Sequence, residues 1–407
     1  MKSLAIVGAG IGGCSAAYLA RKYLPDVKLT IFDAQDKVGG RILTQKIDGV
    51  NLEIGASFFN IISKTILAIV KSEQLELKRI EEQLNFAVWN GSEFTFRSNK
   101  NSAVTSLELL FHHKLSFTRI YHLLNEAKRR VARLYLEKTK PADEINALFE
   151  LARLNEWYGK PFDELLIEKG ANRTFIDQMV TPITRTIYSQ NADLGGFAGI
   201  SSLIGVYDRP IYRLAAGNSI LPGQLVVSSN SAIKLRQKVT SIEKTREGVY
   251  RVYAEGDVTL FDEVIIATPL EIASVELDGI PKPNWEPQRY QKVYTKVMKG
   301  IFKPSFFGLN ESSEPPTIIM TTKEADPIMH INIRKTQKNE SLVTISSTEQ
   351  LTDAHFHGIF KDDGVPILQH CWTAAYPKFK PIEKLPPTVL DEQLIYLNSI
   401  EAAISSM

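Results

Sequence analysis

The sequence contains few of the residues that mark disulfide-rich, nucleic-acid-binding or membrane-spanning proteins. Only two cysteines, Cys14 and Cys371, occur among its 407 residues, so no disulfide framework is expected. The formal net charge is +2 at pH 7, which gives no electrostatic reason to expect a nucleic-acid partner. No uninterrupted apolar run reaches the roughly 18 residues of a transmembrane helix, so no membrane span is expected.

Metal-ligand patterns and a leader segment are also missing. Among the seven histidines, His355 and His357 lie two residues apart and the others are scattered, so no metal site is expected. The scattered ones are His112, His113, His122, His330 and His370. The first three residues lead at once into an apolar strand, which leaves no room for a cleavable signal peptide and predicts a cytoplasmic protein.

The most informative feature that is present is a glycine-rich turn after the first strand. The apolar run Leu4 to Val7 is followed by glycines at positions 8, 10 and 13. In a dinucleotide-binding fold, Gly8 permits the tight turn, Gly10 lets the backbone approach a pyrophosphate, and Gly13 lets the next helix pack closely on the sheet. Asp33 follows Gly13 by 20 residues, where a carboxylate can accept hydrogen bonds from ribose hydroxyls. The spacing therefore predicts a dinucleotide site.

A second run of small residues follows this acid. Gly39-Gly40-Arg41 comes shortly after Asp33, and Gly55-Ala56-Ser57 lies beyond it. Small residues let the backbone pass close beneath a large flat ring, and the Arg41 cation can neutralise a diphosphate or the polar edge of that ring. The run resembles that of the two-dinucleotide-binding-domain flavoproteins, the amine oxidase-like group. The alternative is a hairpin turn at the glycine pair with a surface charge at Arg41.

The order of predicted elements indicates an α/β protein of two interleaved domains. Residues 1–60, 216–280 and 386–407 are expected to form the nucleotide-binding domain, beginning with a strand, a helix over Cys14 to Tyr23 and a second strand. Residues 61–215, mostly helical, and 281–385, mostly sheet, are expected to form the substrate domain. The expected elements after position 60 are a helix over Ile61 to Lys71, a hairpin over Phe86 to Arg97, strands over Lys234 to Ile242, Val249 to Ala254 and Val258 to Ala267, and strands of a second sheet over Tyr290 to Phe302, Thr317 to Thr321, Met329 to Ile333 and Leu342 to Ser346.

Four later blocks of the chain resemble prenylcysteine oxidases. They are Thr184 to Gly199, Ala267 to Leu270, Ala375 to Pro381 and Leu394 to Glu401. Together with the N-terminal glycines these matches extend over almost the whole chain, in the order that the family has them. The glycine motifs are shared by many flavoproteins, whereas the first and last blocks are not. The chain is therefore identified as a member of this family of FAD-dependent oxidoreductases.

The resemblance implies a fold and a reaction. The fold is a two-domain, FAD-binding, Rossmann-like flavoprotein of the amine oxidase-like group, whose substrate domain combines a mixed sheet with helices. The reaction is oxidative cleavage of the thioether of farnesyl- or geranylgeranylcysteine with O2 as acceptor, giving cysteine, a prenyl aldehyde and hydrogen peroxide. Loss of hydride from the carbon between sulfur and the alkene leaves a cation shared by both, so water adds there and the C–S bond breaks. No catalytic triad is expected, because the hydride step needs no strong base.

These patterns also name candidate site residues. Arg185 and Tyr188, spaced i, i+3 on a predicted helix, are candidates for binding the cysteine carboxylate or lining the substrate slot, with a structural ion pair plus a core tyrosine as the alternative. A helix beginning near Ser399-Ile400 is expected to present its amides to the reduced ring. The predicted cofactor-binding residues are Gly8, Gly10, Gly12, Gly13, Asp33, Gly39, Gly40, Arg41, Gly55, Ala56, Ser57, Val239, Thr268, Ser399, Ile400 and Glu401.

Two other functions stay open at this point. A related flavin oxidase of amines or polyprenoids would use an aromatic pair, for which Tyr376 and Tyr396 are available. A non-catalytic carrier similar to the Rab GDP-dissociation inhibitors would bind prenyl tails without flavin. The chain also departs from the family pattern in two places. Asn60-Ile61 stands where the family tends to have His-Pro, and the sequence stops at Met407, where relatives continue the last helix. The second departure predicts either a cofactor site complete by Glu401 or weaker flavin retention.

Overall fold

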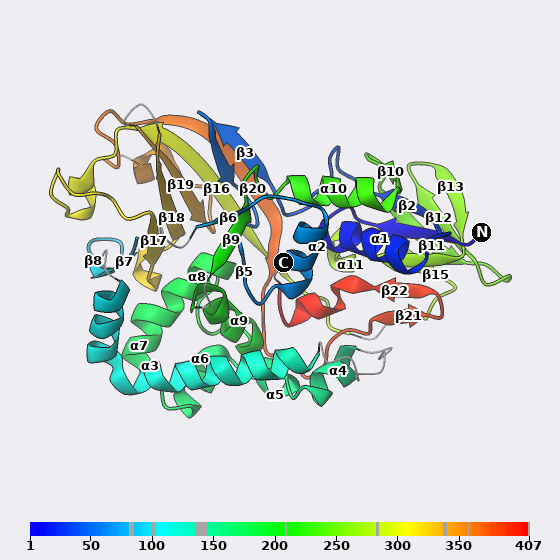
Figure 1. The fold of residues 1–407 in the computed structure, drawn as a ribbon, viewed down its shortest axis with the longest axis horizontal. Helices are drawn as coiled ribbons and strands as arrows, with labels where there is room; N and C mark the ends of the chain where they lie inside the picture. The colour runs from blue at the N-terminus through cyan, green and yellow to red at the C-terminus, as the bar shows by residue number, and fades with distance from the viewer. Residues whose placement is uncertain are drawn as a thin grey trace.

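The computed structural model contains two large β-sheets, each covered by helices or by a further sheet. It describes residues 1–80, 85–98, 102–134, 145–207, 210–281, 285–336, 340–356 and 358–405, with side chains of residues 102–114 and 354 left undescribed. In Figure 1 the two sheets lie toward opposite ends of an elongated molecule, with the N-terminus at the end of the six-stranded sheet. In this part of the chain, none of the helices combines the length and apolarity required to cross a lipid bilayer.

The six-stranded sheet carries the N-terminal glycine turn. Its order is β10-β2-β1-β14-β22-β21, and all neighbouring strands are parallel except β21 and β22. The bounds are β10 Ala232–Lys234, β2 Lys28–Phe32, β1 Ser3–Val7, β14 Glu263–Ile266, β22 Leu394–Tyr396 and β21 Val389–Asp391. Leu4 and Ile6 face a cluster that contains α1 (Ile11–Tyr23) and α10 (Ile220–Ser229), whereas Ala5 and Val7 face the opposite side. A central strand buried on both faces explains why β1 is a continuous apolar run.

A four-stranded sheet, β13-β12-β11-β15, covers that opposite side. Its bounds are β13 Asp257–Phe261, β12 Tyr250–Ala254, β11 Val239–Lys244 and β15 Glu276–Asp278. Val239, Ile242 and Tyr250 pack against β1 and β14 in one buried cluster. The six-stranded sheet is therefore covered by helices on one face and by this small sheet on the other.

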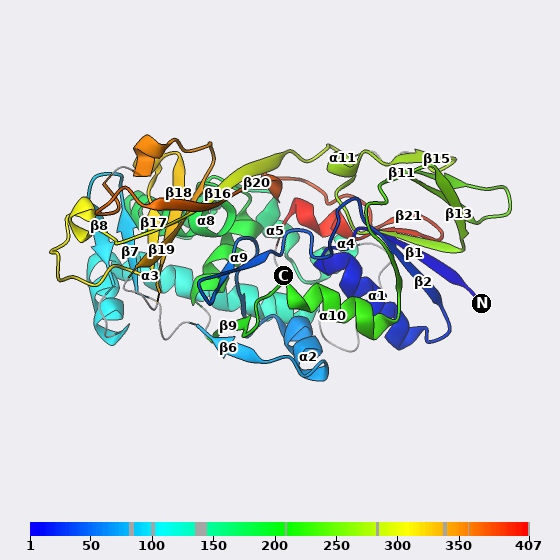
Figure 2. The same ribbon diagram turned by 90° about the horizontal axis from the view of Figure 1, so that it is seen from above.

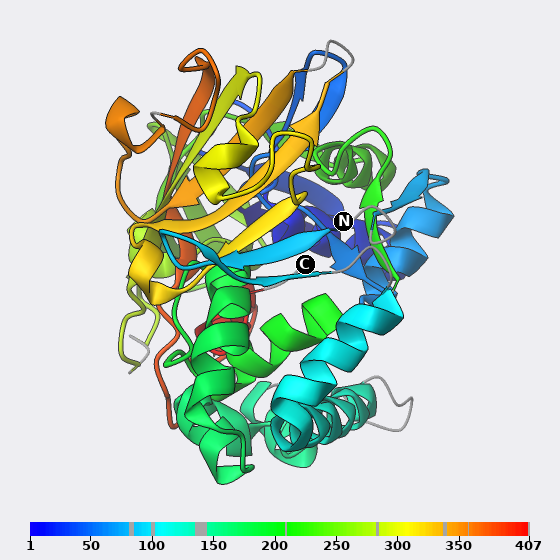
Figure 3. The ribbon, with the colours of Figure 1, turned by 90° about the vertical axis from the view of Figure 1, so that its left-hand side faces the viewer.

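The seven-stranded sheet has the order β20-β16-β19-β18-β17-β7-β8. Its bounds are β20 Val365–Pro377, β16 Tyr290–Gly300, β19 Ser341–Ser347, β18 Ile328–Lys335, β17 Ile318–Thr321, β7 Phe86–Trp89 and β8 Phe94–Arg97. Ile319, Ile331 and Ile345 pack into a cluster on one face, while Val88 and Met320 join the cluster of the helical region on the other. Figure 3 shows this arrangement, with the sheet above the helices.

The helical region lies beneath the seven-stranded sheet. It consists of α3 Ser102–Arg133, α4 Ile145–Leu151, α5 Asn155–Tyr158, α6 Phe162–Glu168, α7 Arg173–Phe175, the π-helix η2 Ile176–Val180, α8 Thr181–Tyr188 and α9 Gly196–Tyr207. The remaining elements are β3 Thr44–Ile47, β4 Val50–Glu53, β5 Phe59–Asn60, β6 Leu77–Arg79, β9 Ile211–Leu214, α2 Lys64–Ser72, α11 Leu270–Ala273 and four short 3-10 helices, η3 Pro304–Phe307, η4 Lys323–Ala325, η5 Asp353–Phe356 and η6 Leu397–Ala402. Figure 2 shows β6 and β9 next to α2, on the side of the molecule between the two large sheets.

Several predicted elements differ from the structure. The strand expected over Lys234 to Ile242 is two strands, β10 and β11, in different sheets, because the chain crosses between sheets at Arg236, which has a φ of 56°. The strand expected over Val258 to Ala267 is likewise split into β13 and β14, because the Asp262 carboxylate is held by the Ser3 N–H and hydroxyl. The helix expected to begin near Ser399 is the 3-10 helix η6, which begins at Leu397. Ser399 lies inside it and donates from its hydroxyl to the Pro386 carbonyl oxygen.

Candidate functional site

The three glycines of the first turn differ in why the position is occupied by glycine. Gly8 has a φ of 109°, and a Cβ there would lie 2.7 Å from the Ala267 carbonyl oxygen. A Cβ at Gly13 would overlap the Gly8 carbonyl oxygen, so this glycine lets α1 pack directly on the turn. Gly10 differs, because it has ordinary backbone angles and a Cβ there would have only the Gly40 Cα within 4 Å. The chain's own packing therefore does not require glycine at position 10.

The open space at Gly10 is the test of whether the turn fits a dinucleotide. A pyrophosphate that approaches the backbone at the N-terminus of α1 would occupy the volume that a side chain at this position would fill. The N-cap of α1 is Gly10 itself, and no side chain caps the helix, so its first amides are free of such a partner. The residues present fit a bound dinucleotide.

The second glycine pair packs directly on the first turn. Gly39 has a φ of 126°, and its N–H donates to the Ala9 carbonyl oxygen at 2.9 Å. Gly40 has a φ of 56°, and a Cβ there would lie 3.0 Å from the Gly10 Cα. Gly12 is different, since a Cβ would meet no atom within 4 Å. The pair is thus a second wall of the same cradle as well as a turn.

Asp33 lies at the end of β2, beside the first turn. Its Oδ2 accepts from the Ala9 N–H at 2.6 Å and its Oδ1 accepts from the Gln35 N–H at 2.7 Å, which leaves lone pairs on both oxygens for ribose hydroxyls. The Gln237 N–H donates to the Asp33 carbonyl oxygen at 2.9 Å, and the Gln237 Oε1 is buried with no hydrogen-bond partner in the described structure. Gln237 is a candidate that the sequence did not indicate, because only the fold brings it to Asp33. Val239, a predicted contact, packs its side chain in the core, so only its backbone is free to face a ligand.

Arg41 joins the cradle to the last part of the chain. Its guanidinium forms an ion pair with the Glu401 carboxylate and donates to the Ala375 carbonyl oxygen at 3.2 Å. The Tyr290 hydroxyl also donates to Glu401, at 3.2 Å, and burial together with the Glu401 charge raises the pKa of Tyr290. Arg41 is therefore part of a half-buried network, which disagrees with the alternative of a surface charge.

The Gly55–Ser57 segment lies against Arg41 and an aromatic ring. A Cβ at Gly55 would overlap the Arg41 carbonyl oxygen and lie 3.1 Å from Cζ2 of Trp372. The Trp372 indole donates to the Ile54 carbonyl oxygen at 3.2 Å, and the Ala56 N–H donates to the Arg41 carbonyl oxygen at 3.0 Å. Thr268, another predicted contact, lies next to the first turn, with its Cβ 3.4 Å from the position of a Gly8 Cβ. The structure thus brings the N-terminal glycines, Asp33, Arg41, Thr268 and Glu401 into one region.

Arg185 and Tyr188 lie on α8, in the helical region. The Arg185 side chain is only 1% exposed, and its guanidinium pairs with Asp326 at 2.7 Å and donates to the Ile328 carbonyl oxygen at 2.9 Å. Burial lowers the pKa of Arg185, and the Asp326 carboxylate opposes that shift. Tyr188 is a core residue, and burial raises the pKa of its hydroxyl. This geometry agrees with the alternative interpretation, a structural ion pair plus a core tyrosine.

The two tyrosines considered as an aromatic pair pack in different clusters. Tyr376 makes an edge-to-face contact with Tyr188, with ring centroids 5.5 Å apart, and packs with the helical cluster. Tyr396 stacks on Trp285 at 5.6 Å in the cluster between the six-stranded and four-stranded sheets. That Tyr376 and Tyr396 could serve as an aromatic pair stays a prediction.

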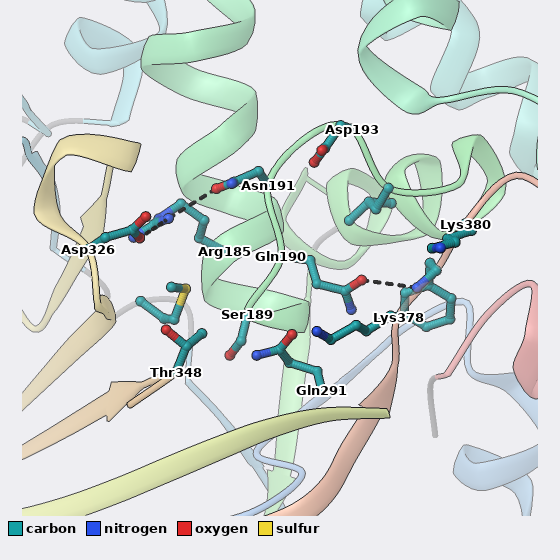
Figure 4. Close-up of a pocket in the computed structure, with 13 residues that line it drawn as sticks. Arg185, Ser189, Gln190, Asn191, Asp193, Gln291, Asp326, Thr348, Lys378 and Lys380 are labelled. Carbon is teal, nitrogen blue, oxygen red and sulfur yellow. Dashed lines mark hydrogen bonds and ion pairs between the residues drawn. The ribbon is translucent and has the colours of Figure 1, made fainter. Parts of the chain in front are cut away.

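A polar cavity of about 330 Å³ adjoins the C-terminus of α8. Most of its lining side chains are polar, and they include Arg185, Ser189, Gln291 and Lys378. Figure 4 shows that Ser189, Gln291 and Lys378 converge at one end, while Arg185 and Asp326 lie at another. Because the lining is polar, this cavity does not suit a prenyl chain.

No group of three or more histidine, cysteine, aspartate or glutamate side chains that could hold a metal ion occurs among the described residues. His357 lies outside that part of the chain, as do the side chains of His112 and His113.

Comparisons with known proteins agree with this geometry. Residues 96–407 match the prenylcysteine lyase family model, and residues 6–72 match an NAD(P)-binding Rossmann-like domain. Prenylcysteine oxidase 1 of Bos taurus is 27% identical over 441 residues, covering 100% of this chain and 85% of that protein. Farnesylcysteine lyase of Arabidopsis thaliana is 26% identical, with the same two coverages.

Solved structures show the fold. A putrescine oxidase bound to putrescine superposes with a TM-score of 0.64 at 16% identity, covering 97% of this chain and 92% of that one. A fatty acid isomerase from P. acnes gives a TM-score of 0.63 at 16% identity, covering 92% and 86%. The fold is therefore that of the amine oxidase-like flavoproteins, as the sequence predicted. Because the family match spans more than three-quarters of its length, the chain belongs to the prenylcysteine lyase family.

Proposed function

We propose that the protein is an FAD-dependent oxidase that cleaves the thioether of a prenylcysteine, with O2 as the final electron acceptor. The observation that carries the proposal is the combination of a family match over residues 96–407 with a cradle that is open at Gly10. The relatives named prenylcysteine oxidase and farnesylcysteine lyase, which align with the whole chain, support the choice of substrate.

The cradle residues would hold FAD by its adenosine and diphosphate. Asp33 has free lone pairs for the ribose, the amides at the start of α1 face the diphosphate, and Arg41 supplies a positive charge close to both glycine turns. Gln237 Oε1 offers a buried acceptor beside Asp33. When bound, FAD supplies a two-electron acceptor for the hydride of the substrate.

The chain's own residues position the substrate and exclude water. Trp372 and Gly55 form a tightly packed wall beside Arg41. Near the end of β20, Tyr376 and Phe379 both pack on the ring of Tyr188. Apolar walls of this kind suit a prenyl group and a thioether, whose sulfur makes favourable contacts with aromatic rings. The His370 ring packs edge-to-face on Trp372 at 4.2 Å, and the hydride step needs no strong base.

The proposal is tested with the purified full-length protein. We expect the absorbance bands of oxidised flavin, and formation of free thiol, prenyl aldehyde and hydrogen peroxide in equal amounts from S-farnesylcysteine. Peroxide from putrescine with no aldehyde from S-farnesylcysteine would favour an amine oxidase instead. A colourless protein that binds a prenylated peptide would favour a carrier.

A further inference from the structure

A histidine of β20 lies at the boundary between the seven-stranded sheet and the cofactor cradle. The His370 ring packs edge-to-face on Trp372, with ring centroids 4.2 Å apart. Trp372 in turn lies against the cradle, since its Cζ2 is 3.1 Å from the position of a Gly55 Cβ and its indole donates to the Ile54 carbonyl oxygen. His370 is therefore separated by one side chain from the apolar wall that suits the thioether.

A second observation links His370 to the cradle. Lys37 lies on the loop between Asp33 and Gly39, and its charge lowers the pKa of His370, in addition to the larger lowering that burial causes. The cross-strand neighbour on β16 is Thr295, which is uncharged and only 2% exposed. No carboxylate among the described residues contributes to the shift. These surroundings favour the neutral imidazole at pH 7, which can accept a proton.

Both ring nitrogens of His370 are available for such a transfer. Neither forms a hydrogen bond within the described part of the chain, and the side chain is only half-buried. His330 of the same sheet differs, because its Nε2 lies 3.2 Å from the Ser346 hydroxyl. An imidazole that holds no structural hydrogen bond is free to exchange protons with a bound molecule.

The proposed reaction contains proton transfers that follow the hydride step. Water forms a C–O bond with the cationic carbon and loses one proton. The C–S bond then breaks with its electron pair on sulfur, which gains a proton to give the thiol, while the hydroxyl group loses its proton to solvent and becomes the aldehyde. The proton released to solvent and the hydride together reduce O2 to hydrogen peroxide. One neutral base that takes the first proton and returns it to sulfur meets both needs.

We propose that His370 is this base, which accepts a proton from the attacking water and donates it to the departing sulfur. The inference rests on the proposed function. It adds a catalytic residue to the steps after hydride loss, whereas hydride loss itself needs no base.

The test separates the two stages in a single anaerobic turnover of the flavin-loaded enzyme with S-farnesylcysteine. Bleaching of the flavin absorbance reports hydride loss, and a thiol reagent reports C–S cleavage. For His370→Gln we expect unchanged flavin content and bleaching within about twofold, with thiol release slowed about 100-fold, a usual size for general acid–base catalysis. His370→Ala should show the same defect and recover with added imidazole, because the half-buried position leaves room for it.

The pH dependence of thiol release provides a second measurement. In the unmodified enzyme the rate should fall as the pH drops below about 6.5, because a protonated imidazole cannot accept a proton from water. Both His370 variants should lack this decline. If neither variant folds with flavin bound, a rate in the unmodified enzyme that is constant from about pH 4.5 to 8 overturns the inference, and a decline over that range supports it.

His330→Gln is the matched control. His330 lies in the same cross-strand row as His370, through Thr295 and Ser346, and three strand spacings of about 4.8 Å place it about 14 Å away. We expect thiol release in this variant at the unmodified rate.

Three results with these variants would overturn the inference and leave the proposed function intact. They are unchanged thiol release in His370→Gln, equal slowing of bleaching and thiol release in that variant, and equal losses in the two histidine variants. An unmodified, flavin-loaded enzyme that releases no thiol from S-farnesylcysteine would remove the proposed function, and the inference with it.

Discussion

At the scale of single residues, the three glycines of the first turn make separable predictions. Gly8 and Gly13 are required by contacts with Ala267 and with the turn itself, whereas Gly10 borders open space. A substitution at Gly8 or Gly13 therefore tests folding, and a substitution at Gly10 tests ligand binding.

For Gly10→Val we expect a folded protein that has lost bound flavin. The side chain would enter the path of the pyrophosphate, while few atoms of the protein lie near enough to be displaced. The absorbance spectrum gives the flavin content, and circular dichroism gives the fold. Gly223→Ala, in α10, is a control, because its Cβ would only reach the Val38 Cγ2 at 4.0 Å. Normal flavin content in Gly10→Val would place the cofactor elsewhere.

His330, on β18, is a second residue that allows a specific prediction, here on how stability depends on pH. Its Nε2 lies 3.2 Å from the Ser346 hydroxyl, its Nδ1 is buried without a partner among the described residues, and burial lowers its pKa to about 4. A histidine whose pKa is lower in the folded than in the unfolded state stabilises the fold above about pH 6.5, and this contribution is lost as the pH falls toward 4.

Between pH 7 and pH 5, His330 should account for at most about 2 kcal/mol of lost unfolding free energy. We expect His330→Gln to be less sensitive to pH than the unmodified protein over this range, as measured by urea unfolding at each pH. Parallel pH profiles for the two proteins would show that His330 takes up a proton as easily in the folded as in the unfolded chain.

At the scale of secondary-structure elements, Arg185 joins the helical region to the seven-stranded sheet. From α8 it reaches Thr321 on β17 at 3.2 Å and the Ile328 carbonyl oxygen on β18 at 2.9 Å, and it pairs with Asp326 between them. One planar guanidinium therefore satisfies acceptors from two strands and the loop that connects them, which an ammonium cannot do.

Arg185→Lys should destabilise the protein by about 2 to 4 kcal/mol, because it removes the hydrogen bonds of a buried guanidinium to Thr321 and to the Ile328 carbonyl oxygen. Chemical denaturation of the purified variant gives this free energy. Arg173→Lys is the matched control, since Arg173 is 53% exposed in its ion pair with Asp163, and a change below about 1 kcal/mol is expected there. If both substitutions have the same small effect, Arg185 does not connect the two layers in the way described.

At the scale of the whole molecule, local sequence patterns were sufficient to predict the elements whose structure is determined within one segment of the chain. The helix after the first glycine turn and the hairpin at Asn90-Gly91 were predicted to within a few residues, because glycines and periodic apolar residues lie next to each other in the chain. The expected division into domains stays a prediction, but the two large sheets are assembled from the segments on which it was based.

The sequence could not indicate features that depend on distant partners. The breaks after Lys234 and Phe261 arise because neighbouring strands belong to different sheets, and the burial of Arg185 arises because β17 and β18 surround it. Gln237 was missed for the same reason, since it gains its importance from Asp33, far away in the chain. The long strand β20 was not predicted because most of its residues before Ala375 are partly or fully exposed, which obscures any apolar pattern.

The ion pair between Arg41 and Glu401 has a consequence for the order of folding. The two partners stand 360 positions apart, so their contact closes a loop that contains most of the residues between the first glycine turn and the last 3-10 helix. A contact between such distant segments costs loop-closure entropy that a contact between neighbours does not. The local glycine turns are therefore expected to form before the carboxylate arrives to neutralise this arginine.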